Sequence, residues 1–116
     1  MTENLTQTAP PLAVRVATGT TVAELSGEID LLVAQSLTAR LDALTAATCP
    51  DLVLDMSAVS FIDCQGLGVL CRTRNRVLAR QGRLRLITRD ACFLRLLRIV
   101  GLTDVFEIHP RLPRLS

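Results

Sequence analysis

From residue 21 onward, short runs of aliphatic and β-branched residues alternate with longer segments in which apolar residues recur every three or four positions. The first pattern is typical of strands and the second of amphipathic helices. Strands separated by helices pair in parallel through right-handed crossovers. The alternation therefore predicts an α/β fold built on a mixed, mostly parallel sheet with about three helices.

Turn and capping residues place the individual elements. Gly19-Thr20 suits a two-residue hairpin turn, so we expect the domain to open with an antiparallel pair of strands. Each helix is expected to follow an aspartate that can cap it. The expected strands are residues 14–18, 21–26, 52–56, 84–87 and 105–108, and the capping residues are Asp30, Asp63 and Asp90.

The apolar spacing also predicts which side of each helix is buried. We expect the second helix to end at Gly82 and the third at Gly101, and Arg72, Arg76 and Arg80 to point outward from the second. The expected buried stripes are Val33, Leu37, Leu41 and Leu44 in the first helix, Leu67, Leu70, Cys71, Val77 and Leu78 in the second, and Phe93, Leu96, Leu97 and Val100 in the third.

The chain has 116 residues, of which 49% are hydrophobic, which is enough for one core. We therefore expect a flexible segment over residues 1–11, a single domain over 12–109 and a short tail over 110–116. Neither an apolar run of membrane-spanning length nor a signal-peptide pattern is present in the sequence. We accordingly expect a cytoplasmic protein.

Charge is distributed unevenly along the chain. Residues 1–71 contain 2 arginines and 8 acidic residues, whereas residues 72–116 contain 11 arginines and 3 acidic residues. A basic half can bind an acidic protein or a nucleic acid. The arginines are spread over helix and strand positions without interleaved aromatic residues, however, which favours a solvated face over a nucleic-acid site.

The four cysteines, Cys49, Cys64, Cys71 and Cys92, have neither CxxC spacing nor a nearby pair of histidines. Zinc sites and disulfide frameworks need such patterns, so we interpret the cysteines as reduced thiols and predict no metal. Gly66 and Gly68 match neither phosphate-loop pattern, and we predict no cofactor.

Polar residues interrupt the apolar pattern at one turn, within the segment SFIDCQGLGVL of residues 60–70. The apolar pair before Asp63 indicates the end of a strand, and the segment from Gly66 indicates a helix. The first N–H groups of a helix lack intrahelical acceptors and carry positive partial charge. Cys64, Gln65 and Gly66 are therefore predicted to bind an anion or a partner's hydrogen-bond acceptor.

Three carboxylates, on Asp30, Asp55 and Asp63, are expected at one end of the sheet. Such a group can bind a metal ion or act in acid–base catalysis. We favour a structural explanation, in which Asp30 and Asp63 cap helices and Asp55 makes a turn contact. His109, the only histidine, is expected at the surface.

Four ordered motifs resemble the STAS domain family, the anti-sigma factor antagonists, over about residues 12–109. They are Gly27-Glu28-Ile29-Asp30, the segment LVLDMSAVSFID of residues 52–63, Asp63-x-x-Gly66-Leu67-Gly68-Val69-Leu70, and the helix after Asp90 that ends at Gly101-Leu102. The resemblance implies a non-enzymatic bacterial protein. It would bind an anti-sigma factor that is also a serine kinase, release a sigma factor, and be inactivated when a serine at the start of the second helix is phosphorylated.

At that turn the sequence departs from the family pattern. The pattern is Asp-Ser-Ser-Gly-Leu, whereas residues 63–67 are Asp-Cys-Gln-Gly-Leu, so Cys64 occupies the position of the phosphorylated serine. A phosphate there would expel the partner by charge repulsion and desolvation, and Cys64 offers a serine kinase no hydroxyl group. Ser57 and Ser60 are expected to be less exposed and away from the helix start, which makes them poor substitutes.

Cys64 has two interpretations. A thiol at a helix N-terminus can become a redox sensor or a nucleophile, although the carboxylate of Asp63 opposes this. Alternatively, the cysteine replaces serine in size and loses only the modification. We favour the second interpretation, because no resolving cysteine at close spacing or histidine base is evident in the sequence.

The resulting hypothesis is a binding module that acts as an anti-sigma factor antagonist without the usual phosphoacceptor. Its expected partner surface consists of Asp63, Cys64, Gln65, Gly66, Arg72 and Arg76, with Asp30 at the rim. An accessory subunit of a membrane transporter and a redox-responsive regulator acting through Cys64 are the alternatives. The oligomeric state is left open.

Overall fold

The computed structural model describes residues 12–114, which form five strands and three helices. The segment expected to be flexible, residues 1–11, and the end of the expected tail, residues 115–116, lie outside the described residues. The strands are β1 (Leu12–Ala17), β2 (Thr20–Ile29), β3 (Asp51–Ile62), β4 (Arg83–Ile87) and β5 (Glu107–His109), and the helices are α1 (Leu31–Leu44), α2 (Cys64–Ala79) and α3 (Ala91–Ile99).

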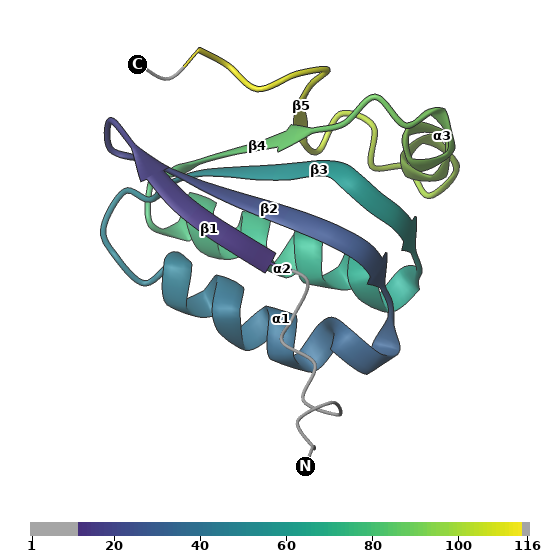
Figure 1. Ribbon diagram of the computed structural model, residues 1–116, viewed down its shortest axis with the longest axis horizontal. Coiled ribbons are helices and arrows are strands. Elements are labelled where there is room, and N and C mark those ends of the chain that lie inside the picture. Colours follow the sequence, from purple (N-terminus) through teal and green to yellow (C-terminus); the bar gives the residue numbers. More distant parts are fainter. Residues whose placement is uncertain (1–11, 115–116) are drawn as a thin grey trace.

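The strands form one sheet in the order β1-β2-β3-β4-β5. β1 pairs with β2 antiparallel, and every later neighbour is parallel. α1 and α2 lie side by side against one face of the sheet, and α3 lies at the end where β3 extends past β4 (Figure 1). The predicted mixed sheet, opening hairpin and three helices are therefore confirmed.

The main core fills the space between the sheet and the α1–α2 layer. Leu25, Leu54 and Leu86 from the strands meet Leu37 and Leu70 from the helices, and all are fully buried. On the opposite face a smaller cluster of Val22, Val53 and Ile87 is covered by Leu112 from the C-terminal segment. The sheet is thus thickly covered on one face only.

Two predicted buried positions are wrong. Leu78 is 47% exposed, because the buried stripe of α2 runs through Thr73, whose hydroxyl donates to the Val69 carbonyl at 2.9 Å. A threonine whose hydroxyl is hydrogen-bonded can occupy a core position. The buried stripe of α2 therefore runs through Thr73 and Val77 and leaves Leu78 outside it. Val100 is 46% exposed, because α3 ends at Ile99.

The limits of all five expected strands differ from the structure by one residue or more. The hairpin turn occupies residues 18–19, one position before the expected pair. The last strand begins at Glu107, because the Val105 carbonyl accepts a hydrogen bond from Arg74 Nε at 2.8 Å in place of a ladder bond. β3 is longer than expected and continues to Ile62.

β3 pairs with β2 along most of its length but with β4 only over residues 51–55. Two register shifts place one extra β3 residue between residues 55 and 58 and another between 59 and 61. Such bulges bend a strand and increase its twist. Figure 1 shows the second half of β3 bending away from β4 towards the start of α2.

Candidate functional site

The parallel strands β2 and β3 end at the same edge of the sheet, and each is followed at once by a capped helix. Asp30 Oδ1 accepts from the Leu32 N–H at 3.0 Å, and Asp63 Oδ1 accepts from the Gly66 N–H at 2.9 Å. The two turns are joined directly, because the Asp63 N–H donates to the Ile29 carbonyl at 3.2 Å. The predicted capping roles of Asp30 and Asp63 are confirmed.

Gly66 lets α2 approach the end of β2. A Cβ atom at this position would lie 2.3 Å from the Ile29 carbonyl oxygen and 2.7 Å from Ile62 Cγ1. Only glycine fits such a close approach without a shift of the backbone. The glycine of the turn motif therefore holds the two helix starts together.

The start of α2 is open to solvent. Cys64 and Gln65 are both exposed, and within residues 12–114 their N–H groups have no backbone acceptor. The Asp63 side chain accepts only from the N–H of Gly66, and the Asp63 carbonyl accepts from the N–H of Leu67 at 2.9 Å. The two remaining N–H groups carry the positive partial charge of the helix end and can donate hydrogen bonds to an oxygen of a partner.

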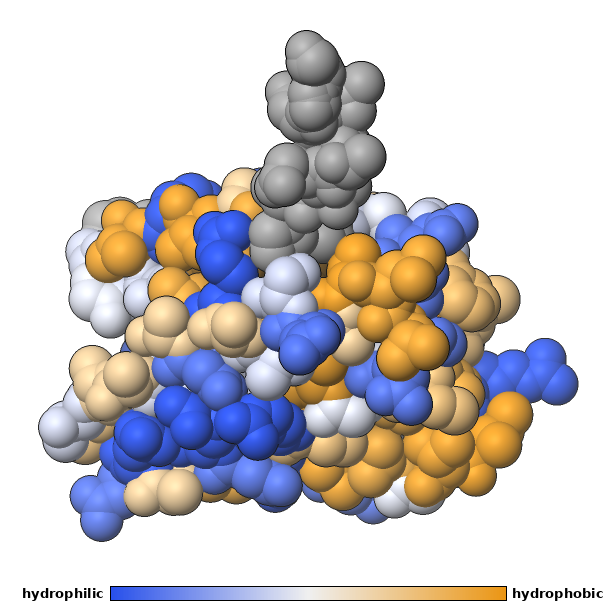
Figure 2. Space-filling model, turned by 90° about the horizontal axis from the view of Figure 1, so that it is seen from below, coloured by the Kyte–Doolittle hydropathy of each residue, from blue (hydrophilic) through white to orange (hydrophobic). Residues whose placement is uncertain are grey.

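Large exposed apolar side chains lie on the same two turns as these donors. Leu31 is 65% exposed, Leu32 is 88% exposed and Phe61 is 53% exposed. On the face covered by α1 and α2, hydrophobic surface gathers towards the end where both helices begin, and hydrophilic surface gathers towards the other end (Figure 2). We call residues 30–32 and 61–66 the capped corner.

The apolar part of the capped corner was missed in the sequence, because Leu31, Leu32 and Phe61 had been assigned no exposed role. No local signal distinguishes Leu31 and Leu32, because two adjacent apolar residues can share the buried side of a helix. In the structure both are exposed, at the first two positions of α1.

A shallow groove of about 360 Å³ runs from the capped corner between α1 and α2. Its lining includes the small residues Ala34 on α1 and Gly68 on α2, together with Gln65 and Arg72 on α2. A Cβ at Gly68 would meet no atom within 4 Å. The groove therefore extends the exposed surface along the first half of both helices.

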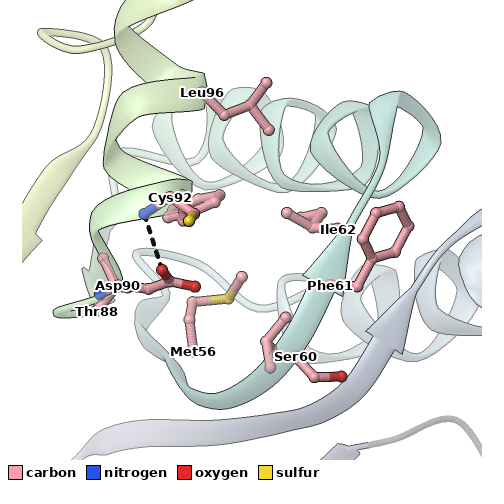
Figure 3. A pocket seen from close by; sticks show the side chains of 10 residues that line it. Met56, Ser60, Phe61, Ile62, Thr88, Asp90, Cys92 and Leu96 are labelled. Carbon is pink, nitrogen blue, oxygen red and sulfur yellow. Dashed lines mark hydrogen bonds between the residues drawn. The ribbon is translucent and has the colours of Figure 1, made fainter.

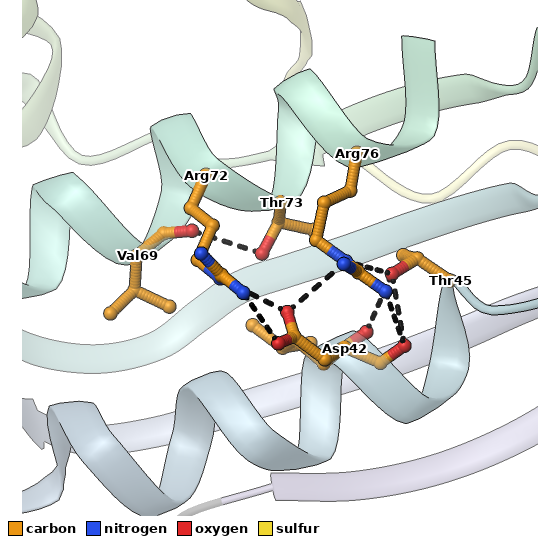
Figure 4. Close-up of polar contacts among 7 residues, drawn as sticks. Asp42, Thr45, Val69, Arg72, Thr73 and Arg76 are labelled. Atoms are coloured by element: carbon orange, nitrogen blue, oxygen red, sulfur yellow. Dashed lines mark hydrogen bonds and ion pairs between the residues drawn. The ribbon is translucent and has the colours of Figure 1, made fainter. Parts of the chain in front are cut away.

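The two arginines expected on the partner surface are bound to α1 (Figure 4). Arg72 pairs with Asp42 through both oxygens, with Nε–Oδ1 at 3.2 Å and Nη2–Oδ2 at 2.8 Å. Arg76 Nε lies 3.2 Å from Asp42 Oδ1 and donates to Thr45 Oγ1 at 3.1 Å. Arg72 lies in the groove, whereas the half-buried Arg76 lies outside its lining and does not point outward as expected.

Asp42 was not identified from the sequence, although it links the two helices. The hydrogen bond from Arg72 lowers the pKa of the Asp42 carboxyl. The charges of Arg72, Arg76 and Arg80 act in the same direction, and burial opposes them. The carboxylate therefore stays ionised and holds α1 against α2.

A second hollow, of about 220 Å³, adjoins the capped corner between the free end of β3 and α3 (Figure 3). Met56, Phe61 and Ile62 line it from β3, and Phe93 and Leu96 line it from α3. Ser60, Thr88, Asp90 and Cys92 add polar atoms to its lining. Because Phe61 belongs to both the hollow and the capped corner, the two form a continuous surface.

Asp55 does not join Asp30 and Asp63 at the end of the sheet, because it pairs with Glu24, before the last residues of β2 and β3. Asp55 Oδ1 accepts from the Ser57 N–H at 3.0 Å, which confirms its turn contact. Within residues 12–114, no group of three acidic, cysteine or histidine side chains is placed to hold a metal ion. Ser57 and Ser60 were expected to be less exposed than the helix start, which is wrong because both are exposed, but both lie in β3 and away from the helix start.

His109 and the cysteines complete the comparison. His109 is half-buried and its Nε2 lies 2.9 Å from Glu107 Oε2. Cys49, Cys64 and Cys92 are exposed, Cys71 is partly buried, and all four are free thiols. No helix in the described part of the chain is both long and apolar enough to cross a membrane.

A mixed five-stranded sheet with two helices on one face, and an Asp-x-x-Gly turn that starts the second of them, define a STAS-type domain. Residues 11–114 match the STAS domain family, and the chain belongs to that family. The crystal structure of an anti-sigma factor antagonist from Mycobacterium paratuberculosis is 32% identical, with a TM-score of 0.78 over 87% of this chain and 86% of that chain.

Two curated relatives come from Mycobacterium tuberculosis. The anti-sigma-F factor antagonist RsfB is 29% identical over 94 residues, which cover 81% of this chain and 76% of RsfB. The anti-sigma-F factor antagonist RsfA is 32% identical over 69 residues, which cover 59% of this chain and 54% of RsfA. The family suspected from the sequence motifs is confirmed.

Proposed function

We propose that the chain is a cytoplasmic, non-enzymatic anti-sigma factor antagonist that binds its anti-sigma factor through the capped corner. The observation that carries the proposal is the composition of that corner. The unpaired N–H groups of Cys64 and Gln65 lie on the same two joined turns as the exposed residues Leu31, Leu32 and Phe61. Exposed apolar groups around directional donors are typical of a protein-binding surface.

The proposed antagonist lacks the usual phosphorylation switch. We infer that its partner is an anti-sigma factor of the serine-kinase type, as the turn motif implies. The exposed side chain at the start of α2 is the thiol of Cys64. With no hydroxyl to phosphorylate there, the corner keeps its charge, and the chain stays competent to bind or acts as a decoy.

Arg72 contributes to the proposed surface in a limited way. Its guanidinium lies at the far end of the groove and is already paired with Asp42. A carboxylate of the partner would have to share the Arg72 guanidinium with Asp42. We therefore assign most of the binding free energy to the capped corner, and to Arg76 the role of joining α2 to α1.

The test is binding of the purified chain to a purified anti-sigma factor from the same genome, measured by titration calorimetry. Leu32→Glu should weaken binding about tenfold or more, because it places a charge in the apolar part of the corner. Ile99→Glu is the matched control, since Ile99 is 71% exposed on α3 and should leave affinity unchanged. Equal affinity of both variants and the unsubstituted chain would place binding elsewhere.

Affinity purification from the native host separates this function from a transporter subunit. An antagonist should recover an anti-sigma factor, and Leu32→Glu should lose it while Ile99→Glu keeps it. Recovery of a transport ATPase in its place would exclude the proposal. The fold itself is compatible with either role.

A further inference from the structure

We propose that the chain forms a two-fold dimer in which β1 pairs with the same strand of a second copy. β1 is an edge strand, bonded to β2 on one side. On its other side, no strand of the described residues pairs with it. An open edge presents a row of backbone N–H and C=O groups that another strand can pair with.

The side chains along this edge are apolar on the helix side of the sheet. Val14 is paired with Ala23, a core residue, so Val14 and Val16 point to the face that α1 covers. They are 39% and 69% exposed. Natural edge strands usually carry charges that prevent pairing, but the one charge here, Arg15, lies on the other face and pairs with Glu24 at 3.9 Å.

A groove of about 440 Å³ lies between this edge and α1. Val14 lines one side, and Ser36, Ala39, Ala43 and Leu44 line the other, together with the stem of Arg40. Small residues on α1 leave room for a second helix to approach closely. The edge strand offers backbone hydrogen-bonding groups and the groove offers apolar contacts, and one binding partner can use both.

A second copy is the occupant that satisfies both features. When two β1 strands pair antiparallel about an axis perpendicular to the sheet, each copy supplies a free edge and an apolar row. Directly opposed residues then lie on the same face of the sheet. Val14 opposite Val14 of the second copy places Leu12 against Val16 and makes a continuous apolar row over the two α1 helices.

Charge distinguishes the two symmetric registers that pair the greatest part of β1, one centred on Val14 and one on Arg15. The second would place Arg15 directly opposite Arg15 of the second copy, and like charges in opposed positions destabilise a pair. In the Val14-centred register Arg15 lies opposite Ala13. The apolar row and the charge pattern therefore favour the same arrangement.

The dimer leaves the capped corner free. β1 covers β2 only as far as Leu25, so the last residues of β2 and the turns that follow lie beyond the paired edge. The proposal thus goes beyond the proposed function and gives the assembly two separate corners. The dimer proposal does not depend on the identity of the anti-sigma factor.

The experiment is sedimentation equilibrium of the full chain over a range of micromolar concentrations, compared for three proteins. The unsubstituted chain should reach twice the mass of one copy. Val16→Lys should raise the dimer dissociation constant about tenfold or more, because it buries an unpaired charge at the new seam. Ile99→Lys, at an equally exposed position on α3, should dimerise like the unsubstituted chain.

Hydrogen exchange of the β1 amides separates strand pairing from other contacts. In the dimer, the outward-facing amides among residues 12–17 should exchange more slowly than in dilute samples. A single-copy mass at every concentration would overturn the proposal. So would a dimer that survives Val16→Lys, or one whose formation leaves exchange in β1 unchanged.

Discussion

Gly66 and Ile29 approach so closely that a Cβ on Gly66 would lie 2.3 Å from the Ile29 carbonyl oxygen. The same carbonyl accepts the Asp63 N–H at 3.2 Å. The last residue of β2 thus contacts both the capping residue of α2 and the first buried residue of that helix. The shape of the capped corner depends on this contact.

Gly66→Ala should destabilise the protein by about 1–3 kcal/mol, because the added methyl group meets backbone and forces α2 away from β2. It should also weaken partner binding by displacing Cys64 and Gln65. Urea denaturation and calorimetric titration measure the two effects.

Gly68→Ala is the matched control, on the same helix but facing open space. It should stabilise the protein by about 0.5–1 kcal/mol, since alanine is favoured over glycine within a helix. Equal effects of the two substitutions on stability would contradict the close approach at Gly66.

Arg76→Ala should cost more stability than Arg72→Ala. Arg76 is the less exposed of the two side chains and also donates to Thr45 Oγ1 and to the Asp42 carbonyl at 3.2 Å. Its loss should cost about 1–2 kcal/mol, since it leaves partly buried acceptors unpaired. Urea denaturation of both variants measures the two losses of stability. A larger loss for Arg72→Ala would contradict this prediction and would show that the Arg72–Asp42 pair is the main link between the helices.

Glu107 should make the stability depend on acid pH. Hydrogen bonds from Arg83, and then from His109, lower the pKa of Glu107 from 4.5 to about 2. A carboxyl whose pKa is lowered by folding stabilises the native state above its unfolded pKa and loses that effect as the pH falls through the folded value. The contribution should therefore be complete above about pH 4.5 and disappear towards pH 2.

Glu107→Gln provides the measurement. Near neutral pH the unsubstituted chain should be more stable by less than about 1 kcal/mol, because solvent screens a pair whose glutamate side chain is 39% exposed. That difference should shrink as the pH falls from 4.5 towards 2. A difference that stays constant or grows on acidification would contradict the assignment.

Local patterns in the sequence were sufficient for the fold and for the position of the turn. Asp30, Asp63 and Asp90 cap their helices as predicted, because capping depends on residues two or three positions apart. The apolar spacing likewise predicted the sides of the helices that face the sheet. These features depend on neighbours in sequence.

Features that depend on neighbours in space were missed. The link from Asp42 to Arg72 joins residues 30 positions apart, and no helical period reveals how two helices are rotated against each other. The two bulges that let β3 continue past Met56 depend on its pairing with β2. The exposed leucines after Asp30 were overlooked because apolar residues are ordinarily assigned to a core.

The central claim is that the capped corner binds a kinase-type anti-sigma factor and carries no phosphorylation switch. The direct measurement is the intact mass of the chain after incubation with its anti-sigma factor and ATP, with complex formation followed in the same sample. The unsubstituted chain should stay bound and gain no phosphate, whereas Cys64→Ser should gain one phosphate and dissociate. Phosphate on residues 60–66 of the unsubstituted chain, or a Cys64→Ser variant that binds but is never phosphorylated, would contradict the account.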